Sequence, residues 1–316
     1  MIPFQRTPYY RFGLKAGLAN LSRNGWKLGA RKTLGKILQP VNSYGRFPEY
    51  SFFEEGLEML WRPSPAGEEI RILDVGSPKL FGLYLAYHYP VRVWLTDINP
   101  LNIDEYRLLW SALSQGAAGA VVFDLQDGRR LSFPDRMFDG VYAMSVIEHI
   151  GGDAGDSLAC AEMLRVLRPG GRLVVSVPFG PRYMEQQIRG LKDAVERTKD
   201  TRPYFFQRIY DYPHFCDRVI EPLQPALAEQ RLVTVFHRRL SLVKAIHWLR
   251  ERLGEDIMGI LGFTNPLQSR LCNIAEAGAK TDFFASYAPI YRPRHIYADL
   301  IWTARKRQKE NREIQP

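Results

Sequence analysis

The chain has 316 residues, of which 46% are hydrophobic, and a formal net charge of +9. This provides for one large core with additions or for two modest domains. No stretch approaches the roughly 20 apolar residues of a membrane-spanning helix, and the N-terminus lacks the continuous apolar core of a secretory signal. Three widely spaced cysteines, Cys160, Cys216 and Cys272, argue against a disulfide scaffold or a cysteine zinc site and fit a cytoplasmic protein.

The N-terminal segment is strongly basic, because residues 1–50 carry nine lysines and arginines against the single acid Glu49. Leucines recur loosely at helical spacing among these cations, and residues 52–61 form a clearer amphipathic helix. We therefore expect residues 1–68 to be a helical arm that caps the core or lies on an anionic membrane surface. A merely solvated basic surface is the alternative.

The middle of the chain alternates short apolar runs with helical patterns. Strands are expected at residues 71–73, 91–95, 120–123, 138–145 and 172–177, and helices at 80–89, 101–115 and 156–167. Such alternation implies right-handed crossovers and a parallel sheet, which binds its ligand at the carboxyl ends of the strands.

This rhythm weakens beyond residue 180, where residues 181–230 are rich in aromatic and charged side chains. Residues 232–237 and 296–303 are strand-like, and residues 241–262 are helix-like. Residues 304–316 are expected to be a frayed polar tail. The expected domains are a basic arm at 1–68, a core at 69–180, a lid with insertions and closing strands at 181–304, and a basic tail at 305–316.

Four motifs occur in order within residues 72–178: ILDVGSP, LTDINP, FDLQDGRRLSFPDRMFDGVYAMSVIEHI and MLRVLRPGGRLVVSVP. Together they resemble the class I S-adenosylmethionine-dependent methyltransferases, most closely the small-molecule type. The resemblance implies an α/β fold with a doubly wound, mostly parallel seven-stranded sheet of Rossmann-like methyltransferase type. It also implies an N-terminal helical arm and helical insertions after the fifth strand and before the last strand.

S-adenosylmethionine is the cofactor that the resemblance implies. Asp74 would hold its ammonium group directly or through water, Gly76 would let the backbone pass close to it, and Asp97 would accept from both ribose hydroxyls. The full set of expected cofactor-binding residues is Asp74, Gly76, Ser77, Pro78, Asp97, Ile98, Asp124, Leu125 and Ser145. An Asp after a strand also commonly caps the next helix, and Pro78 stands where the family usually has a glycine.

Glu148 and His149 follow the fourth strand, beside the expected position of the transferred methyl group. His149 is a candidate general base because the usual pKa of histidine lies near neutrality. Glu148 would orient it, or the pair would help to bind a divalent ion, although with only two ligands we predict no metal. Alternatively, His149 caps a helix or lines the pocket without chemistry.

Aromatic residues after the fifth strand are candidates for acceptor binding, because the family builds its acceptor lid there. Tyr210, Tyr212 and His214 are the candidates, and ordinary core packing is the alternative for them.

The expected function is methyl transfer to oxygen or nitrogen of a small-molecule or carrier-borne acceptor, in the cytoplasm or at the membrane periphery. The alternative is a catalytically silent methyltransferase-like domain that binds partners through its basic ends. The chain lacks a nucleophilic Cys after the fourth strand and an RNA-binding signature, so no specific nucleic acid is expected as a partner.

Overall fold

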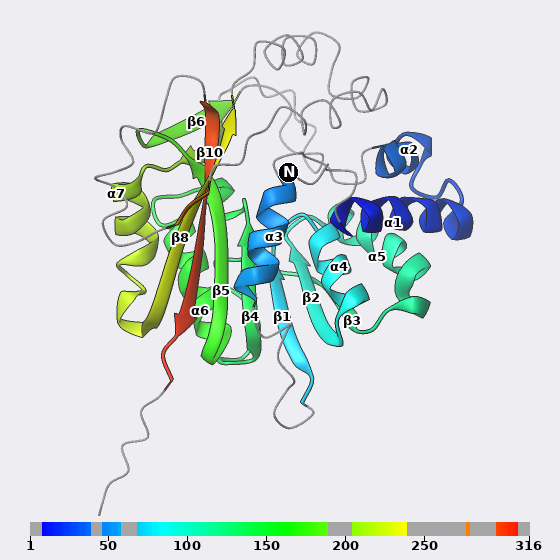
Figure 1. Ribbon diagram of the computed structural model, residues 1–316, viewed down its shortest axis with the longest axis horizontal. Helices are drawn as coiled ribbons and strands as arrows, with labels where there is room; N and C mark the ends of the chain where they lie inside the picture. The colour runs from blue at the N-terminus through cyan, green and yellow to red at the C-terminus, as the bar shows by residue number, and fades with distance from the viewer. Residues whose placement is uncertain are drawn as a thin grey trace, which may run out of the picture.

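The computed structural model describes residues 8–38, 46–57, 68–188, 204–238, 276–278 and 295–308. Across these residues the chain forms a central sheet with helices on both faces (Figure 1). None of the helices described is both long and apolar enough to cross a membrane.

Eight strands of the described chain form this sheet, in the order β3-β2-β1-β4-β5-β10-β8-β9. They are β1 (Ile70–Val75), β2 (Val91–Asp97), β3 (Ala120–Leu125), β4 (Phe138–Met144), β5 (Leu167–Phe179), β8 (Leu227–Arg238), β9 (Glu276–Gly278) and β10 (His295–Lys306). Strands β1 to β5 pair in parallel, while β10 runs antiparallel to both β5 and β8. The predicted doubly wound, mostly parallel seven-stranded sheet is confirmed, and the short β9 adds an eighth strand at the edge.

Three helices connect the parallel strands. Helices α4 (Leu80–His88) and α5 (Pro100–Leu113) lie on one face of the sheet, and α6 (Gly155–Val166) lies on the other (Figure 1). Asn99 caps α5, since its side chain accepts from the Leu101 amide and Pro100 fills the first helical position, which needs no N–H donor. This cap starts α5 directly after β2, at the carboxyl edge of the sheet.

The N-terminal arm is helical, as predicted, and consists of α1 (Pro8–Asn24), α2 (Ala30–Leu38) and α3 (Arg46–Gly56). The helix expected at residues 52–61 therefore begins earlier. Glu54 of α3 joins this arm to α4, because its carboxylate accepts from the hydroxyls of Tyr9, Tyr84 and Tyr89. The arm thus packs on the same face of the sheet as α4 and α5.

In the described residues, the insertion predicted after β5 contains strands as well as helical turns. It first forms an antiparallel strand pair, β6 (Met184–Ile188) with β7 (Tyr204–Ile209), and only then α7 (Tyr212–Phe215) and a π-helical turn at Cys216–Ile220. The aromatic and β-branched residues of β7 favour a strand over a helix. The helix expected at residues 241–262 lies outside the described residues.

The basic residues after the last strand do not begin a frayed tail at residue 304. Strand β10 continues to Lys306, whose ammonium donates to the carbonyls of Leu164 and Leu167 at 2.7 and 2.6 Å. These carbonyls lie at the end of α6, where intrahelical donors run out. Lys306 therefore belongs to the folded core.

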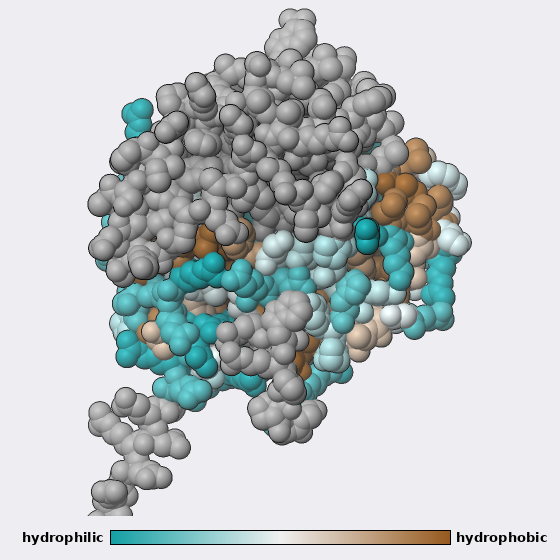
Figure 2. All heavy atoms as spheres, viewed as in Figure 1, coloured by the Kyte–Doolittle hydropathy of each residue, from teal (hydrophilic) through white to brown (hydrophobic). Residues whose placement is uncertain are grey.

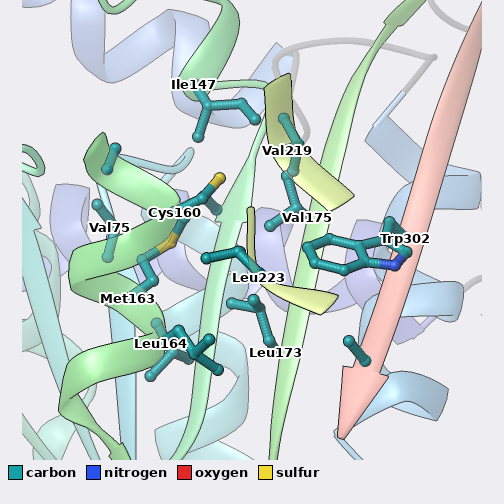
Figure 3. Packing of buried hydrophobic residues seen from close by; sticks show 14 of the residues in the cluster. Val75, Ile147, Cys160, Met163, Leu164, Leu173, Val175, Val219, Leu223 and Trp302 are labelled. Atoms are coloured by element: carbon teal, nitrogen blue, oxygen red, sulfur yellow. The ribbon is translucent and has the colours of Figure 1, made fainter. Parts of the chain in front are cut away.

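A hydrophobic cluster fills the space between the sheet and α6 (Figure 3). Cys160, Met163 and Leu164 project from α6 toward β5, and Trp302 of β10 closes the far side. A second cluster lies on the opposite face and includes α1, α3, α4 and α5. Both faces of the sheet are therefore buried, which leaves the carboxyl edge of the strands as the place for a site.

Candidate active site

A cavity of about 320 Å³ lies at this carboxyl edge. Its walls come from the ends of four neighbouring strands, β1 to β4. The lining residues are Val75, Gly76, Thr96, Asp97, Ile98, Gln126, Asp127, Gly128, Arg129, Val146, His149, Ile150 and Gly151. The volume falls within the range of roughly 300–1,000 Å³ of small-molecule sites.

Gly76 forms the turn at the floor of the cavity. Its φ of +69° lies in the left-handed region, and a Cβ atom there would meet Val146 Cγ1 at 2.8 Å. Its amide donates to the Thr96 carbonyl at 3.0 Å, which holds the turn against the end of β2. Only glycine satisfies both the conformation and the space.

Ser77 fixes the other side of this turn, since its hydroxyl accepts from the Met144 amide at 2.9 Å. Ser77 is buried, and neither Ser77 nor Pro78 lines the cavity. Both residues therefore shape the turn from behind.

Asp97 presents its carboxylate to the cavity. It accepts from the Asn99 amide at 2.9 Å and from Asn102 Nδ2 at 3.2 Å, both at the start of α5. Ile98 beside it is 71% exposed. A fixed carboxylate next to an exposed apolar side chain can bind a diol and an adjoining flat ring.

Asp74 does not reach the cavity, which corrects the role that we expected for it. Its side chain is fully buried, and Oδ1 accepts from the Ser77 amide at 2.9 Å while Oδ2 accepts from the Tyr142 hydroxyl at 2.7 Å. Lys79 Nζ donates to Oδ1 at 3.1 Å. Burial raises the pKa of Asp74, although Lys79, Tyr142 and the Ser77 amide oppose that rise.

Lys79 is the residue that sequence reasoning missed. Its buried ammonium lies between the two carboxylates, 3.1 Å from Asp74 Oδ1 and 3.6 Å from Asp97 Oδ2. An internal cation thus occupies the position at which we expected Asp74 to meet the ammonium of the cofactor. The signal in the sequence was a lysine directly after the Gly-Ser-Pro turn.

The predicted residues at the ends of β3 and β4 are not among those that line the cavity. Asp124 accepts from Gln126 Nε2 at 2.8 Å, and Leu125 is exposed. Ser145 has a φ of +49°, and its hydroxyl donates to Glu49 Oε1 at 3.2 Å. Glu49 is a buried carboxylate from α3 that also accepts from the Ser176 hydroxyl at 2.6 Å, and sequence reasoning did not select it.

His149 lines the cavity from a short 3-10 helix, η4 (Ile147–His149). Its Nδ1 lies 2.8 Å from the Phe206 carbonyl of β7. A carbonyl only accepts, so Nδ1 carries the proton and Nε2 is the basic nitrogen. Nε2 lies 3.8 Å from Oε1 of the buried Glu148, which places a carboxylate beside the nitrogen that would become charged.

The three aromatic candidates for acceptor binding do not line this cavity. Tyr210 is fully buried and donates to Asp156 Oδ2 at 2.7 Å, so it belongs to the core. Tyr212 packs against the same core, and His214 bonds to Asp211 while stacking on Tyr183. Tyr210 therefore follows the alternative of core packing, while an acceptor role of Tyr212 and His214 stays a prediction.

Arg208 of β7 holds one wall of the cavity in place. The buried guanidinium donates to the carbonyls of Ile150 and Gly152 at 2.7 and 2.6 Å, on either side of Gly151. Strand β7 thus fixes both His149, through Phe206, and the loop that follows it. Among the described residues no group of three or more His, Cys, Asp or Glu side chains could hold a metal ion.

Comparisons with known proteins agree with this architecture. Residues 73–175 match the sequence model of a family described as a methyltransferase domain. A ubiquinone/menaquinone biosynthesis C-methyltransferase of Saccharophagus degradans is 40% identical over 86 residues, which are 27% of this chain and 32% of that protein. The protein of the same name in Bordetella parapertussis is 33% identical over 144 residues, 40% of this chain and 52% of that protein.

Two solved structures are similar to this chain at low sequence identity. A methyltransferase of Methanosarcina mazei that depends on S-adenosylmethionine has 17% identity and a TM-score of 0.44, covering 76% of this chain and 94% of that one. Phosphoethanolamine N-methyltransferase 2 of Haemonchus contortus, solved with S-adenosylmethionine, has 15% identity and a TM-score of 0.43, covering 96% and 59%.

Residues 73–175 are therefore similar to a methyltransferase domain, in agreement with the predicted resemblance and with the predicted cofactor, S-adenosylmethionine. The matched segments span about a third to a half of the curated relatives' length. Those relatives are named for transfer to carbon, so they do not support the expected transfer to oxygen or nitrogen, and nothing in them supports the silent binding domain.

Proposed function

We propose that this protein transfers the methyl group of S-adenosylmethionine to a small-molecule acceptor, with His149 as the general base. The observation that carries the proposal is that Asp97 and His149 line one cavity, on the ends of different strands. The ring of His149 is already oriented by the Phe206 carbonyl.

The cavity fits the cofactor. Gly76 leaves room for backbone to approach a ligand closely, Asp97 would bind the ribose hydroxyls, and Ile98 with Leu125 would lie near the adenine. Asp124, near the end of β3, would accept a hydrogen bond from the adenine amino group. When bound, the cofactor supplies an electrophilic methyl group on a sulfonium centre.

His149 would remove the proton that keeps the acceptor from being nucleophilic. Nε2 would take this proton because Nδ1 already donates to Phe206. The Glu148 carboxylate would then stabilise the resulting imidazolium. Glu148 is in this sense a positioning group rather than a base.

We propose carbon as the atom methylated, since the curated relatives are named C-methyltransferases. Removing a proton from a hydroxyl on an aromatic ring moves its electron pair onto a ring carbon, which could then attack the methyl group as the methyl–sulfur bond breaks. The methylated ring carbon would then lose its own proton to solvent, which restores the aromatic ring. A hydroquinone with an unsubstituted ring carbon is therefore a suitable test acceptor. We assign residues 69–180 to cofactor binding and residues 181–304 to the acceptor side.

Calorimetry and a labelled transfer assay test the two roles separately. Asp97→Asn should weaken S-adenosylmethionine binding roughly tenfold to a hundredfold, because hydrogen bonds to a charged group are lost. Asp104→Asn on the exposed surface of α5 is the matched control and should bind normally. Unchanged affinity in Asp97→Asn would place the cofactor elsewhere.

His149→Ala should bind the cofactor normally and transfer methyl to the hydroquinone roughly 100- to 10,000-fold more slowly. Mass spectrometry of the product distinguishes a methyl group on carbon from one on oxygen. A wild-type rate in His149→Ala would remove the general base from the proposal, and an O-methyl product would overturn carbon transfer.

A further inference from the structure

Helices α1 and α2 form a basic hairpin, which we define as residues 8–38. This segment contains no Asp or Glu. Its cations are Arg11, Lys15, Arg23, Lys27, Arg31, Lys32 and Lys36, and of these only Lys36 is not exposed. The hairpin is thus a concentrated positive region at one end of the molecule.

The inner side of the basic hairpin is tied to α5. Lys32 and Lys36 both pair with Glu105 at 2.7 Å, and Asn24 Nδ2 donates to the Leu108 carbonyl at 2.9 Å. Although burial opposes its charge, Tyr106 and Glu105 raise the pKa of Lys36. The hairpin is therefore a fixed part of the fold, and its outer side is a defined surface.

That outer side combines the cations with large apolar side chains. On α1, Arg11 and Leu18 are both exposed and lie seven residues apart, which places them on one face, while the ammonium of the exposed Lys15 lies over the ring of Tyr87 in α4. Leu18 is 49% exposed, Trp26 in the turn is 54% exposed, and Leu34 on α2 is 38% exposed. Figure 2 shows hydrophobic surface at the end of the molecule where α1 and α2 lie.

We propose that the basic hairpin docks on the surface of a lipid bilayer that contains anionic lipids. Leucine and tryptophan beside lysine and arginine are the pattern of a helix that lies in the membrane interface, with its apolar residues among the acyl chains and its cations at the headgroups. Tryptophan in particular favours the membrane–water interface.

Nucleic acid fits this surface less well. Its phosphates would attract the cations, but the aliphatic Leu18 and Leu34 would remain in water, because bases are bound by stacking on aromatic rings. A bilayer is the partner that satisfies both the charge and the apolar side chains.

Co-sedimentation of the full chain with vesicles tests the proposal. The protein should pellet with vesicles of phosphatidylcholine and phosphatidylglycerol, and should stay in the supernatant with phosphatidylcholine alone. Binding should weaken as salt screens the headgroups. Emission from Trp26 should shift to shorter wavelength on binding, and Trp26→Phe should lose this shift.

Two pairs of variants separate charge from apolar insertion. Arg11→Gln with Lys27→Gln should weaken binding about fivefold for each cation lost, and Leu18→Ser with Leu34→Ser should also weaken it. The matched controls lie away from the hairpin: Arg182→Gln for charge and the exposed Leu158→Ala on α6 for apolar surface. Circular dichroism checks that each variant is folded.

Four results would overturn the inference. They are wild-type protein that does not pellet with anionic vesicles, binding that Leu18→Ser with Leu34→Ser leaves unchanged, equal losses in the controls, and retention by duplex DNA in preference to vesicles. None of these results depends on the proposed methyl transfer.

Discussion

Lys79 donates a hydrogen bond to Asp74 at 3.1 Å inside the turn that follows β1. The same ammonium lies 3.6 Å from Asp97 at the end of β2. Two strand ends are therefore joined by one buried cation beneath the cavity. The ammonium of Lys79 therefore lies against both carboxylates although it is itself buried from solvent.

Replacing this cation tests the arrangement. Lys79→Met should lower the free energy of unfolding by about 3–5 kcal/mol, because it leaves buried carboxylates without their partner. Burial raises the pKa of Asp74 and Lys79 no longer opposes it in the variant, so the neutral carboxyl dominates at low pH. The deficit should therefore grow as the pH rises.

Urea denaturation at several pH values measures this effect. Lys79→Met combined with Asp74→Asn should recover part of the loss, since one of the two charges is then gone. Lys27→Met, at an exposed position, should stay within about 0.5 kcal/mol of wild type. Equal stability of Lys79→Met and wild type would show that the pair contributes little.

A second prediction concerns the turn at Gly76. Gly76→Ala combines an unfavourable φ with a contact between the new Cβ and Val146, so it should destabilise the protein and weaken cofactor binding. Gly152→Ala is the matched control: its φ is +89°, and nothing lies within 4 Å of the added Cβ. The control should cost only the backbone term of about 1–2 kcal/mol.

Thermal denaturation and calorimetry compare the two alanine variants. The difference in their melting temperatures reports the steric contact alone. If both variants bound the cofactor as wild type does, the turn would not be the floor of the site.

A third prediction concerns acid and the contacts that Asp156 of α6 makes with Tyr210 and Arg218. Burial alone would raise the pKa of Asp156, but hydrogen bonds from Arg218 and Tyr210 lower it below its usual value. The stability from this ionised carboxylate is complete above the unfolded pKa of roughly 4 and is lost as the pH falls toward the lower folded pKa. Asp156→Asn should therefore be much less stable at neutral pH, with a gap that narrows in acid.

Denaturation of wild type and Asp156→Asn between neutral and acid pH measures the gap. Asp153→Asn is the control, because this residue lies just before α6 and its side chain is exposed. A gap that stays constant as the pH falls would mean that the Asp156 charge makes no contribution.

Arg208 should determine the order of the cavity wall. Arg208→Met removes the donors to Ile150 and Gly152, so hydrogen exchange in residues 150–152 should rise while exchange in β1 stays slow. Arg182→Met, an exposed position before β6, is the control. Unchanged exchange at residues 150–152 would show that other contacts hold the loop.

The sequence predicted the sheet well because strand–helix alternation and strand-end polar residues are local patterns. Asp97 and His149 were placed at one edge by that rule alone, since parallel strands bring their carboxyl ends together. Asp74 also follows the end of a strand, but its carboxylate accepts hydrogen bonds from Lys79 and Tyr142 inside the fold. Tyr142 lies 68 residues away in the chain, so no local pattern indicates this contact.

Other features depend on contacts between distant segments and left no local signal. Tyr210 is part of the core because its hydroxyl donates to Asp156, which lies 54 residues away in the chain. Glu49 reached the strand ends only because α3 packs across the sheet. The β6–β7 pair was missed because its two strands are joined only by contacts between separate segments, Met184–Ile188 and Tyr204–Ile209.

The position of β10 has a consequence for synthesis on the ribosome. Strand β8 borders β10 rather than β5, so its inner edge has no partner until residues 295–306 have emerged. The edge of β5 that faces away from β4 pairs with the same segment, so it also stays unpaired until then. The part of the sheet beyond β5 can therefore assemble only after β10 has been synthesised. Until then the nascent chain exposes two unpaired strand edges, to which chaperones can bind.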